Sequence, residues 1–298
     1  MMTIDPDFKI AAAPISWGVC EVPGWGRVLD APVVLGQMAE LGVKATELGP
    51  PGYLPRDPAR LRALLGDHDL RLIGGFLAVA LHSDPDAAVA AAEESAALFA
   101  ACGAEVLVLA AATGLDGYDD RPELTAAEWR TLVDTAARIR DTAAAHGLRT
   151  VLHPHVGTHV ETEAEVERFI ADSDLPLCLD TGHLLIGGTD PVALARRFPD
   201  RIGHLHLKDV RADLADRVRT GELAYTDAVG QGIYVPLGEG DVDIEAMVRF
   251  VHEAGYTGWY VLEQDTALGP DSADGVPKRD TARSLAHLDK IVSRLAAA

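Results

Sequence analysis

The feature that most constrains this chain of 298 residues is an alternation of short apolar runs with longer helical patterns, repeated eight times. A continuous apolar run is typical of a parallel strand that is covered on both faces. Pairs such as Asp84-Pro85 and Asp190-Pro191 have the residue types that start helices. The expected strands are residues 10–17, 44–49, 70–80, 105–112, 149–155, 175–180, 202–208 and 259–264.

This alternation predicts an α/β fold, namely a single (β/α)₈ TIM barrel that spans residues 1–298 as one domain. The alternative is an open, doubly wound sheet. That alternative is disfavoured because the chain has neither a GxGxxG turn nor a GxxxxGK[ST] loop, which carry the usual nucleotide chemistry of such sheets. Helical patterns between the runs include residues 87–102, 126–146, 163–171, 244–254 and 281–295.

One segment, residues 210–243, interrupts this alternation of strands and helices between the seventh strand and its helix. A loop of this length in a compact domain is usually functional or has structure of its own. Its first part, residues 213–219, has a helical pattern, and it contains Gly221, Gly230, Gly232, Gly238 and Gly240. In a barrel it lies on the catalytic face, so we expect a lid or a pocket wall. A surface insertion without a role is the alternative.

The overall charge restricts the partners. The formal net charge is −20 and the isoelectric point is about 4.8. Such a surface repels nucleic acid and anionic lipid, so we expect neither as a partner. No apolar run approaches the ~18 residues of a membrane-spanning helix.

The cysteines and the N-terminus indicate a compartment. Cys20, Cys102 and Cys178 show no CxxC spacing and no disulfide framework, which is typical of a reducing cytoplasm. The first ten residues, MMTIDPDFKI, lack the charged-then-apolar design of a secretory leader. We therefore expect a cytoplasmic protein.

The ends of the expected strands carry the candidate site, because catalytic side chains of such barrels lie at the C-terminal strand ends. Residues two apart on a strand share a face, and inward-facing imidazoles are costly without partners. Imidazole and carboxylate groups together suit a divalent metal ion. The fifth strand ends with His153 and His155, the sixth with Asp180 and then His183, the seventh with His204, His206 and Lys208, and the eighth with Glu263.

Three further residues have two interpretations each. Trp17 either packs in the core or forms an apolar wall against a substrate ring. Glu47 either caps a neighbour or lies in the active site. Lys208 either extends to the surface or binds a substrate oxygen beside the metal.

Several motifs resemble a known group. The sequences DTGH at residues 180–183, HLHLKD at 204–209 and VLE at 261–263 resemble the xylose-isomerase-like TIM barrels of the sugar-phosphate isomerase/epimerase superfamily. Within that group, PISWG at 14–18, ELGP at 47–50, HPHVGT at 153–158 and VPLGEGDVD at 235–243 resemble the inosose dehydratases of myo-inositol catabolism. The resemblance covers nearly the whole chain.

The resemblance implies one divalent metal ion, with Mn or Co favoured and Mg, Zn or Fe as alternatives. Carried over by position, its ligands are His153, Asp180, His206 and Glu263. The chain departs from the pattern at His153, where most epimerases and isomerases of the group have glutamate. In epimerases that glutamate is one of two opposed carboxylates, so its absence favours a dehydratase.

The implied activity is that of a lyase, which removes water from a cyclic polyol ketone such as 2-keto-myo-inositol (inosose) by α-proton abstraction and β-elimination. His155 and His183 are the expected acid and base, in either order, with Glu263 as another possible base. Lys208 would steady the developing oxyanion. The expected substrate-binding residues are Trp17, Glu47, His155, His183 and Lys208.

Three other functions compete with this one. The first is a ketose 3-epimerase or sugar isomerase of the same superfamily. The second is an apurinic-site endonuclease, which needs a basic groove that a net charge of −20 disfavours. The third is a non-catalytic, metal-dependent sugar-binding protein. Each of the small-molecule functions is compatible with a homo-oligomer, either a dimer or a tetramer.

Overall fold

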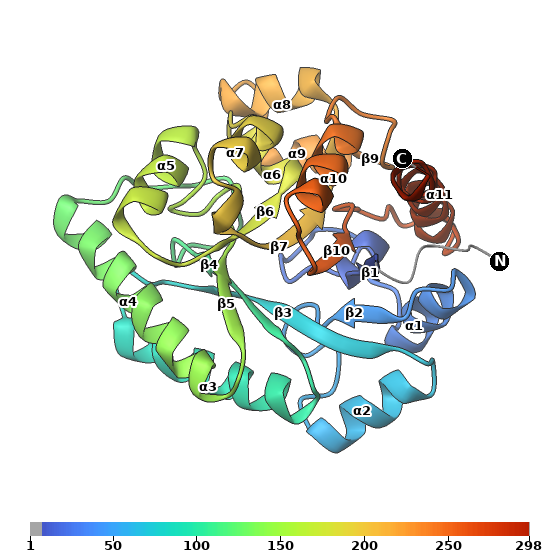
Figure 1. The fold of residues 1–298 in the computed structure, drawn as a ribbon, viewed down its shortest axis with the longest axis horizontal. Coiled ribbons are helices and arrows are strands. Elements are labelled where there is room, and N and C mark those ends of the chain that lie inside the picture. The colour runs from blue at the N-terminus through green and yellow to red at the C-terminus, as the bar shows by residue number, and fades with distance from the viewer. Residues whose placement is uncertain (1–7, 298) are drawn as a thin grey trace.

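The computed structural model describes residues 8–297, and in it eight parallel strands close into a barrel (Figure 1). This confirms the predicted (β/α)₈ fold and excludes the open sheet. Around the barrel the order is β1, β10, β7, β6, β5, β4, β3 and β2. The strands are β1 (Lys9–Ala12), β2 (Ala45–Glu47), β3 (Arg71–Val79), β4 (Val106–Ala111), β5 (Arg149–Leu152), β6 (Leu177–Asp180), β7 (Ile202–Leu207) and β10 (Trp259–Leu262).

Helices surround the barrel and connect its strands, as Figure 1 shows. They are α1 (Ala31–Glu40), α2 (Pro58–Gly66), α3 (Pro85–Ala101), α4 (Ala126–Ala145), α5 (Glu163–Asp172), α6 (Thr181–Ile186), α7 (Pro191–Arg197), α10 (Ile244–Glu253) and α11 (Val276–Ala296). Two short 3₁₀ turns lie at Pro14–Trp17 and Pro199–Arg201.

The helix starts follow from local chemistry. The side chain of Asp84 accepts a hydrogen bond from the backbone of α3, and Asp190 does the same for α7, so both predicted starts are confirmed. Thr125 and Thr162 begin α4 and α5 with reciprocal capping boxes. These caps fix where each connection leaves the barrel rim.

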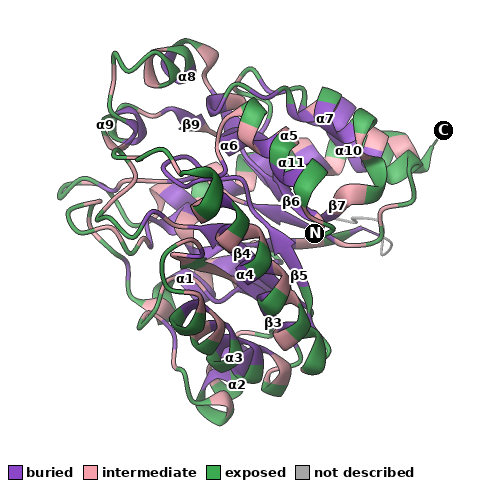
Figure 2. Ribbon diagram, turned by 90° about the vertical axis from the view of Figure 1, so that its left-hand side faces the viewer, coloured by how far each residue is buried: buried purple, intermediate pink, exposed green. Residues whose placement is uncertain are grey.

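Burial separates the strands from the outer helix faces. In Figure 2 most of the barrel strands are largely buried, although β3 is partly exposed in its second half, and the surrounding helices are exposed on their outer sides. The main apolar core lies between the barrel and the helices, and includes Phe99, Leu132, Phe169 and Met247. Most of the buried histidines and charged residues gather instead near one end of the barrel, at or after the C-terminal strand ends.

The segment 210–243 has structure of its own. It contains α8 (Ala212–Arg219) and α9 (Tyr225–Gly230), and its two ends pair as the antiparallel strands β8 (Asp209–Val210) and β9 (Tyr234–Val235). The helix expected at residues 213–219 lies within α8. We call residues 210–243 the excursion.

Asp209 fastens the base of the excursion. Its carboxylate accepts hydrogen bonds from the backbone N–H groups of Gly238, Gly240 and Val242, at 2.8 to 3.0 Å. A side chain at Gly240 would place its Cβ 2.3 Å from Asp209 Oδ1. Glycine is therefore required there, because the backbone itself must approach the carboxylate.

Three expectations from the sequence concern membrane-spanning helices, the thiols and the N-terminus. Within residues 8–297, no helix combines the length and the apolar character needed to cross a bilayer. Cys20, Cys102 and Cys178 are free thiols, as expected. Residues 1–7, which make up most of the stretch that lacks a leader pattern, lie outside the described residues.

Candidate metal and catalytic site

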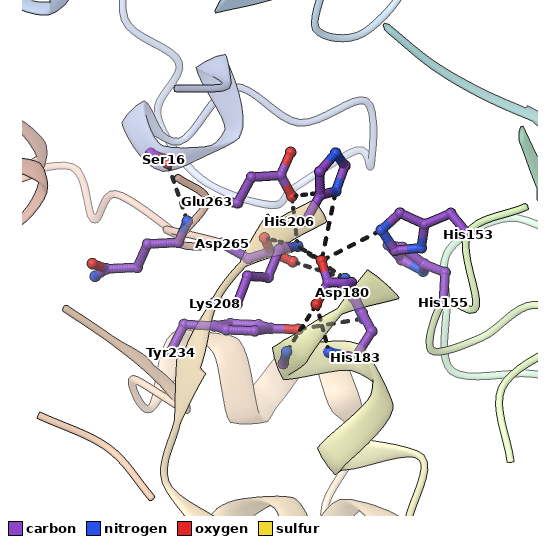
Figure 3. A network of polar contacts seen from close by, with 12 residues as sticks. Ser16, His153, His155, Asp180, His183, His206, Lys208, Tyr234, Glu263 and Asp265 are labelled. Carbon is purple, nitrogen blue, oxygen red and sulfur yellow. Dashed lines mark hydrogen bonds and ion pairs between the residues drawn. The ribbon is translucent and has the colours of Figure 1, made fainter. Parts of the chain in front are cut away.

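The strand register brings the four expected metal ligands together. Asp180 on β6 lies beside His206 on β7 in the register of the two strands. His206 Nδ1 is 3.2 Å from Glu263 Oε2 and 3.6 Å from Asp180 Oδ2. His153 Nε2 is 3.4 Å from the same Asp180 oxygen. Figure 3 shows these side chains turned toward one another at the end of the barrel.

Glu47 fixes the orientation of His206. Its Oε1 atom is 3.1 Å from His206 Nε2 and 2.8 Å from His204 Nε2. Burial alone would raise the pKa of Glu47, but the two histidines hold it well below its usual range. As a carboxylate, Glu47 accepts from His206 Nε2–H, so Nδ1 of that ring is free to face Asp180 and Glu263.

We call His153, Asp180, His206 and Glu263 the ligand set. These residues have the chemistry of a cation site. Asp180 Oδ2 and His206 Nδ1 are buried and have no hydrogen-bond partner within the described part of the chain. The other oxygen of Asp180 accepts from the backbone of Gly182 and His183, which fixes the carboxylate. Unpartnered buried acceptors are costly, and a divalent ion would satisfy both of these atoms. The imidazole and carboxylate donors therefore fit a divalent metal ion.

Lys208 lies beside this set, and is buried rather than extended to the surface. Its Nζ is 2.6 Å from Asp265 Oδ1, 3.1 Å from Glu263 Oε2 and 3.5 Å from Asp180 Oδ2. Burial alone would lower the pKa of Lys208, but these carboxylates raise it well above its ordinary value. The ammonium is thus charged at neutral pH.

Gly182 makes room for this lysine. A Cβ at Gly182 would lie 2.7 Å from Lys208 Cβ and 3.0 Å from the ring of Tyr234. The glycine in the DTGH motif is therefore a packing requirement of the site.

His155 lies on the pocket side of the ligand set, and its ring is 3.7 Å from that of His183, centre to centre. Burial, followed by the charges of His153 and Lys208, holds the pKa of His155 well below its ordinary value. His155 Nδ1 is 2.6 Å from the carbonyl oxygen of Val156 and donates its proton there. The neutral ring therefore keeps an unprotonated Nε2.

His183 has a different position. It is buried, and it does not line the pocket that His155 lines. Burial, followed by the charge of His155, lowers the pKa of His183 well below its usual value. Its Nε2 is 3.0 Å from Lys208 Nζ. The two histidines that the sequence treats as a pair are thus adjacent, but only His155 lines the cavity.

A cavity of about 240 Å³ opens above the ligand set. Its lining combines polar and apolar side chains. The polar ones include His153, His155, His206, Lys208, Glu263 and Glu47. The apolar ones include Ile15, Trp25, Pro50, Phe76 and Leu77.

The expected substrate contact of Trp17 is not formed, because this side chain does not line the cavity. Trp17 is fully buried, and its Nε1 donates to Gln37 Oε1 at 2.9 Å. The short helical turn at Pro14–Trp17 directs the indole toward α1 rather than the barrel axis. Of its two interpretations, the structure favours core packing.

Several residues of the cavity were not singled out as candidates from the sequence, among them Tyr118, Tyr225 and Asp265. Asp265 lies two positions after Glu263, and the spacing rule could have identified it. Tyr118 and Tyr225 lie on connections after β4 and β7, where no periodicity indicates which way a side chain points.

Comparisons with known proteins agree with this fold. Residues 35–291 match the model of the family described as xylose isomerase-like TIM barrel. An inosose dehydratase of Geobacillus kaustophilus is 35% identical over an alignment that covers 99% of this chain and 98% of the relative.

Two solved structures share the fold. A probable 3-DHS dehydratase, AsbF, from Bacillus anthracis superposes with a TM-score of 0.65 at 19% identity, and covers 94% of this chain and 99% of its own. An L-ribulose 3-epimerase superposes with a TM-score of 0.69 at 17% identity, with coverage of 96% and 95%. The barrel, its rim of ligand-type residues and the family match together show that this chain belongs to the xylose isomerase-like TIM barrel family.

Proposed function

We propose that this protein is a metal-dependent hydro-lyase that removes water from a cyclic polyol ketone of the inosose type. The observation that carries the proposal is the full-length similarity to an inosose dehydratase, at 35% identity. The chain also has His153, not glutamate, at the end of β5. In epimerases of the group a glutamate at that position is one of two opposed carboxylates, so its absence disfavours two-base epimerisation.

The proposed ligands of the metal are His153, Asp180, His206 and Glu263, and Mn²⁺ or Co²⁺ suits their donor atoms. When bound, a divalent ion supplies Lewis acidity toward a carbonyl oxygen. The cavity beside these ligands gives a ring ketone access to the site. Glu47 keeps His206 in the tautomer that ligation requires.

His155 is the proposed base. It lines the cavity, it is neutral, and its Nε2 carries the free lone pair. It would take the proton from the carbon next to the ketone, and the imidazolium so formed holds the proton that the departing β-hydroxyl needs in order to leave as water. The atoms then balance without another acid.

Lys208 is the proposed stabiliser of the oxygen on which negative charge develops. Its ammonium is buried and lines the cavity, where a fixed positive charge acts strongly. Glu263, a ligand of the metal, stays close to this ammonium at 3.1 Å. His183, behind His155, would act by holding Lys208 rather than by touching the substrate.

The experiment is to incubate the metal-loaded protein with a panel of inososes, ketohexoses and dehydroshikimate, and to identify the products by mass. The proposal expects loss of one water from an inosose. A ketohexose converted without change of mass would establish an epimerase or isomerase instead. Binding of a panel member without any product would establish a sugar-binding protein.

A further inference from the structure

A closed ring of hydrogen bonds connects the excursion to the candidate site. Lys208 Nζ contacts Asp265 Oδ1 at 2.6 Å, and the second oxygen of Asp265 accepts from the Tyr225 hydroxyl at 3.0 Å. The Tyr225 and Tyr234 hydroxyls are 3.0 Å apart. Tyr234 approaches His183 Nδ1 at 3.4 Å, and His183 Nε2 returns to Lys208 at 3.0 Å. All five side chains are buried.

The donors in this ring have a single consistent direction. Lys208 has only donors, so it donates to both Asp265 and His183 Nε2. A neutral His183 then has its proton on Nδ1 and donates toward Tyr234, so Nδ1 does not accept from the backbone N–H of Val156, which also approaches it at 3.4 Å. Tyr234 donates to Tyr225, and Tyr225 donates to Asp265. The five side chains are thus connected in one buried network, which restricts their movement.

Asp265 and the other carboxylates near Lys208 have different tasks. Asp180 and Glu263 also face this ammonium, but they belong to the proposed ligand set. Asp265 does not belong to that set, and its contact with Lys208 is the shortest of the three. It therefore draws the ammonium away from the ligands and toward the cavity wall that the excursion covers.

We infer that Asp265 is a positioning residue for Lys208, and that Tyr225 and Tyr234 hold Asp265 in place. The packing of the excursion against the barrel and the position of Lys208 are therefore coupled. Figure 3 shows Asp265, Lys208, His183 and Tyr234 in one group. The excursion is then more than a cover, because its tyrosines complete the surroundings of a group in the site. The kinetic part of this inference rests on the proposed dehydratase reaction.

The kinetic test distinguishes a role of the excursion in positioning Lys208 from a role in covering the cavity. Tyr225→Phe keeps the ring and removes one hydroxyl, and Asp265→Asn removes the charge that faces Lys208. If Lys208 acts in the transition state, both variants lower kcat, about tenfold for Tyr225→Phe and about a hundredfold for Asp265→Asn, with little change in KM. The double variant should be no slower than Asp265→Asn alone, because both changes break one network.

Tyr256→Phe is the matched control. Its hydroxyl donates to the carbonyl of Trp259 at 2.9 Å, at the opposite end of the barrel from the site. It should leave kcat and KM unchanged. A rise in KM alone in Tyr225→Phe, or fully additive effects in the double variant, would overturn the inference and leave the excursion as a simple cover.

A second readout needs no activity. In hydrogen exchange followed by mass spectrometry, the amides of α9 and β9 should exchange faster in Asp265→Asn and Tyr225→Phe than in the parent or in Tyr256→Phe. Unchanged exchange in both site variants would overturn the coupling. If the parent fails to dehydrate any inosose, the proposed function fails, whereas this measurement still decides the coupling.

Discussion

The two halves of the candidate site are held in different ways. The ligand set of His153, Asp180, His206 and Glu263 lies at or directly after the ends of barrel strands. Asp180 and His206 are register partners, and the backbone N–H groups of His153 and Glu263 donate to the neighbouring strands. The excursion touches the same site through Tyr225 and Tyr234, and is fastened at its base by Asp209.

This difference indicates a division of labour. Metal ligands need fixed distances, which a closed barrel supplies because no strand can shift without its neighbours. A segment that covers a substrate pocket must instead open, and it can do so only if the free energy of opening is small. We therefore expect changes in the ligand set to abolish the site and changes in the excursion to tune it.

The largest effect is expected from the ligand set itself. Asp180→Asn and His206→Ala each remove a proposed donor atom, and should abolish turnover together with most of the bound metal. Elemental analysis and product assays on the purified variants measure both. Asp141→Asn and His146→Ala, outside the site, are the matched controls. Full metal occupancy in both site variants would show that the ligand set is wrong.

The second effect concerns His155, which belongs to the barrel side but not to the ligand set. His155→Gln should lower kcat by about 10²–10⁴, the usual contribution of a catalytic base, while metal content stays near that of the parent. Exchange of the substrate α-proton in deuterated water should fall in parallel. A variant that still exchanges but no longer eliminates would mean that His155 is the acid instead.

The third effect tests the excursion through its fastening. Asp209→Ala leaves the N–H groups of Gly238, Gly240 and Val242 without their acceptor. The excursion should then loosen, and kcat/KM should fall by about ten- to a hundredfold with unchanged metal content. Metal titration and steady-state kinetics check this. Loss of metal here would show that the two halves of the site are not separable.

The smallest effect is expected from His159, which belongs neither to the ligand set nor to the excursion. Burial, followed by the charges of His82 and Arg121, lowers the pKa of His159 to about 4 from its ordinary value of 6.5. The unfolded chain therefore binds more protons between these two values, so stability is complete above about pH 6.5 and falls as the pH drops toward 4.

His159→Gln should remove part of this dependence, worth about 1 kcal/mol at pH 5, without a change in metal content. Urea unfolding of the parent and the variant at pH 5 and pH 7.5 measures it. Equal pH slopes for the two proteins would show that His159 is not responsible.

The sequence by itself determined the barrel and the polar rim. Continuous apolar runs and helix starts such as Asp84-Pro85 are local features, and a parallel barrel places every strand end on one face. Thus His153, Asp180, His206 and Glu263 could be brought together from strand-end positions and a family resemblance alone. Asp265 was within reach of the same spacing rule.

Only the tertiary structure decided what each side chain faces. Trp17 turns toward Gln37 because a short helical turn follows β1, and His183 lies behind His155 because α6 begins directly after Asp180. Glu47 turned out to contact two histidines that lie far away along the chain. Tyr225 reaches Asp265 across 40 positions, through an excursion without periodicity. Periodicity encodes which face of a regular element is buried, whereas contacts between connections depend on packing that forms only when the barrel closes.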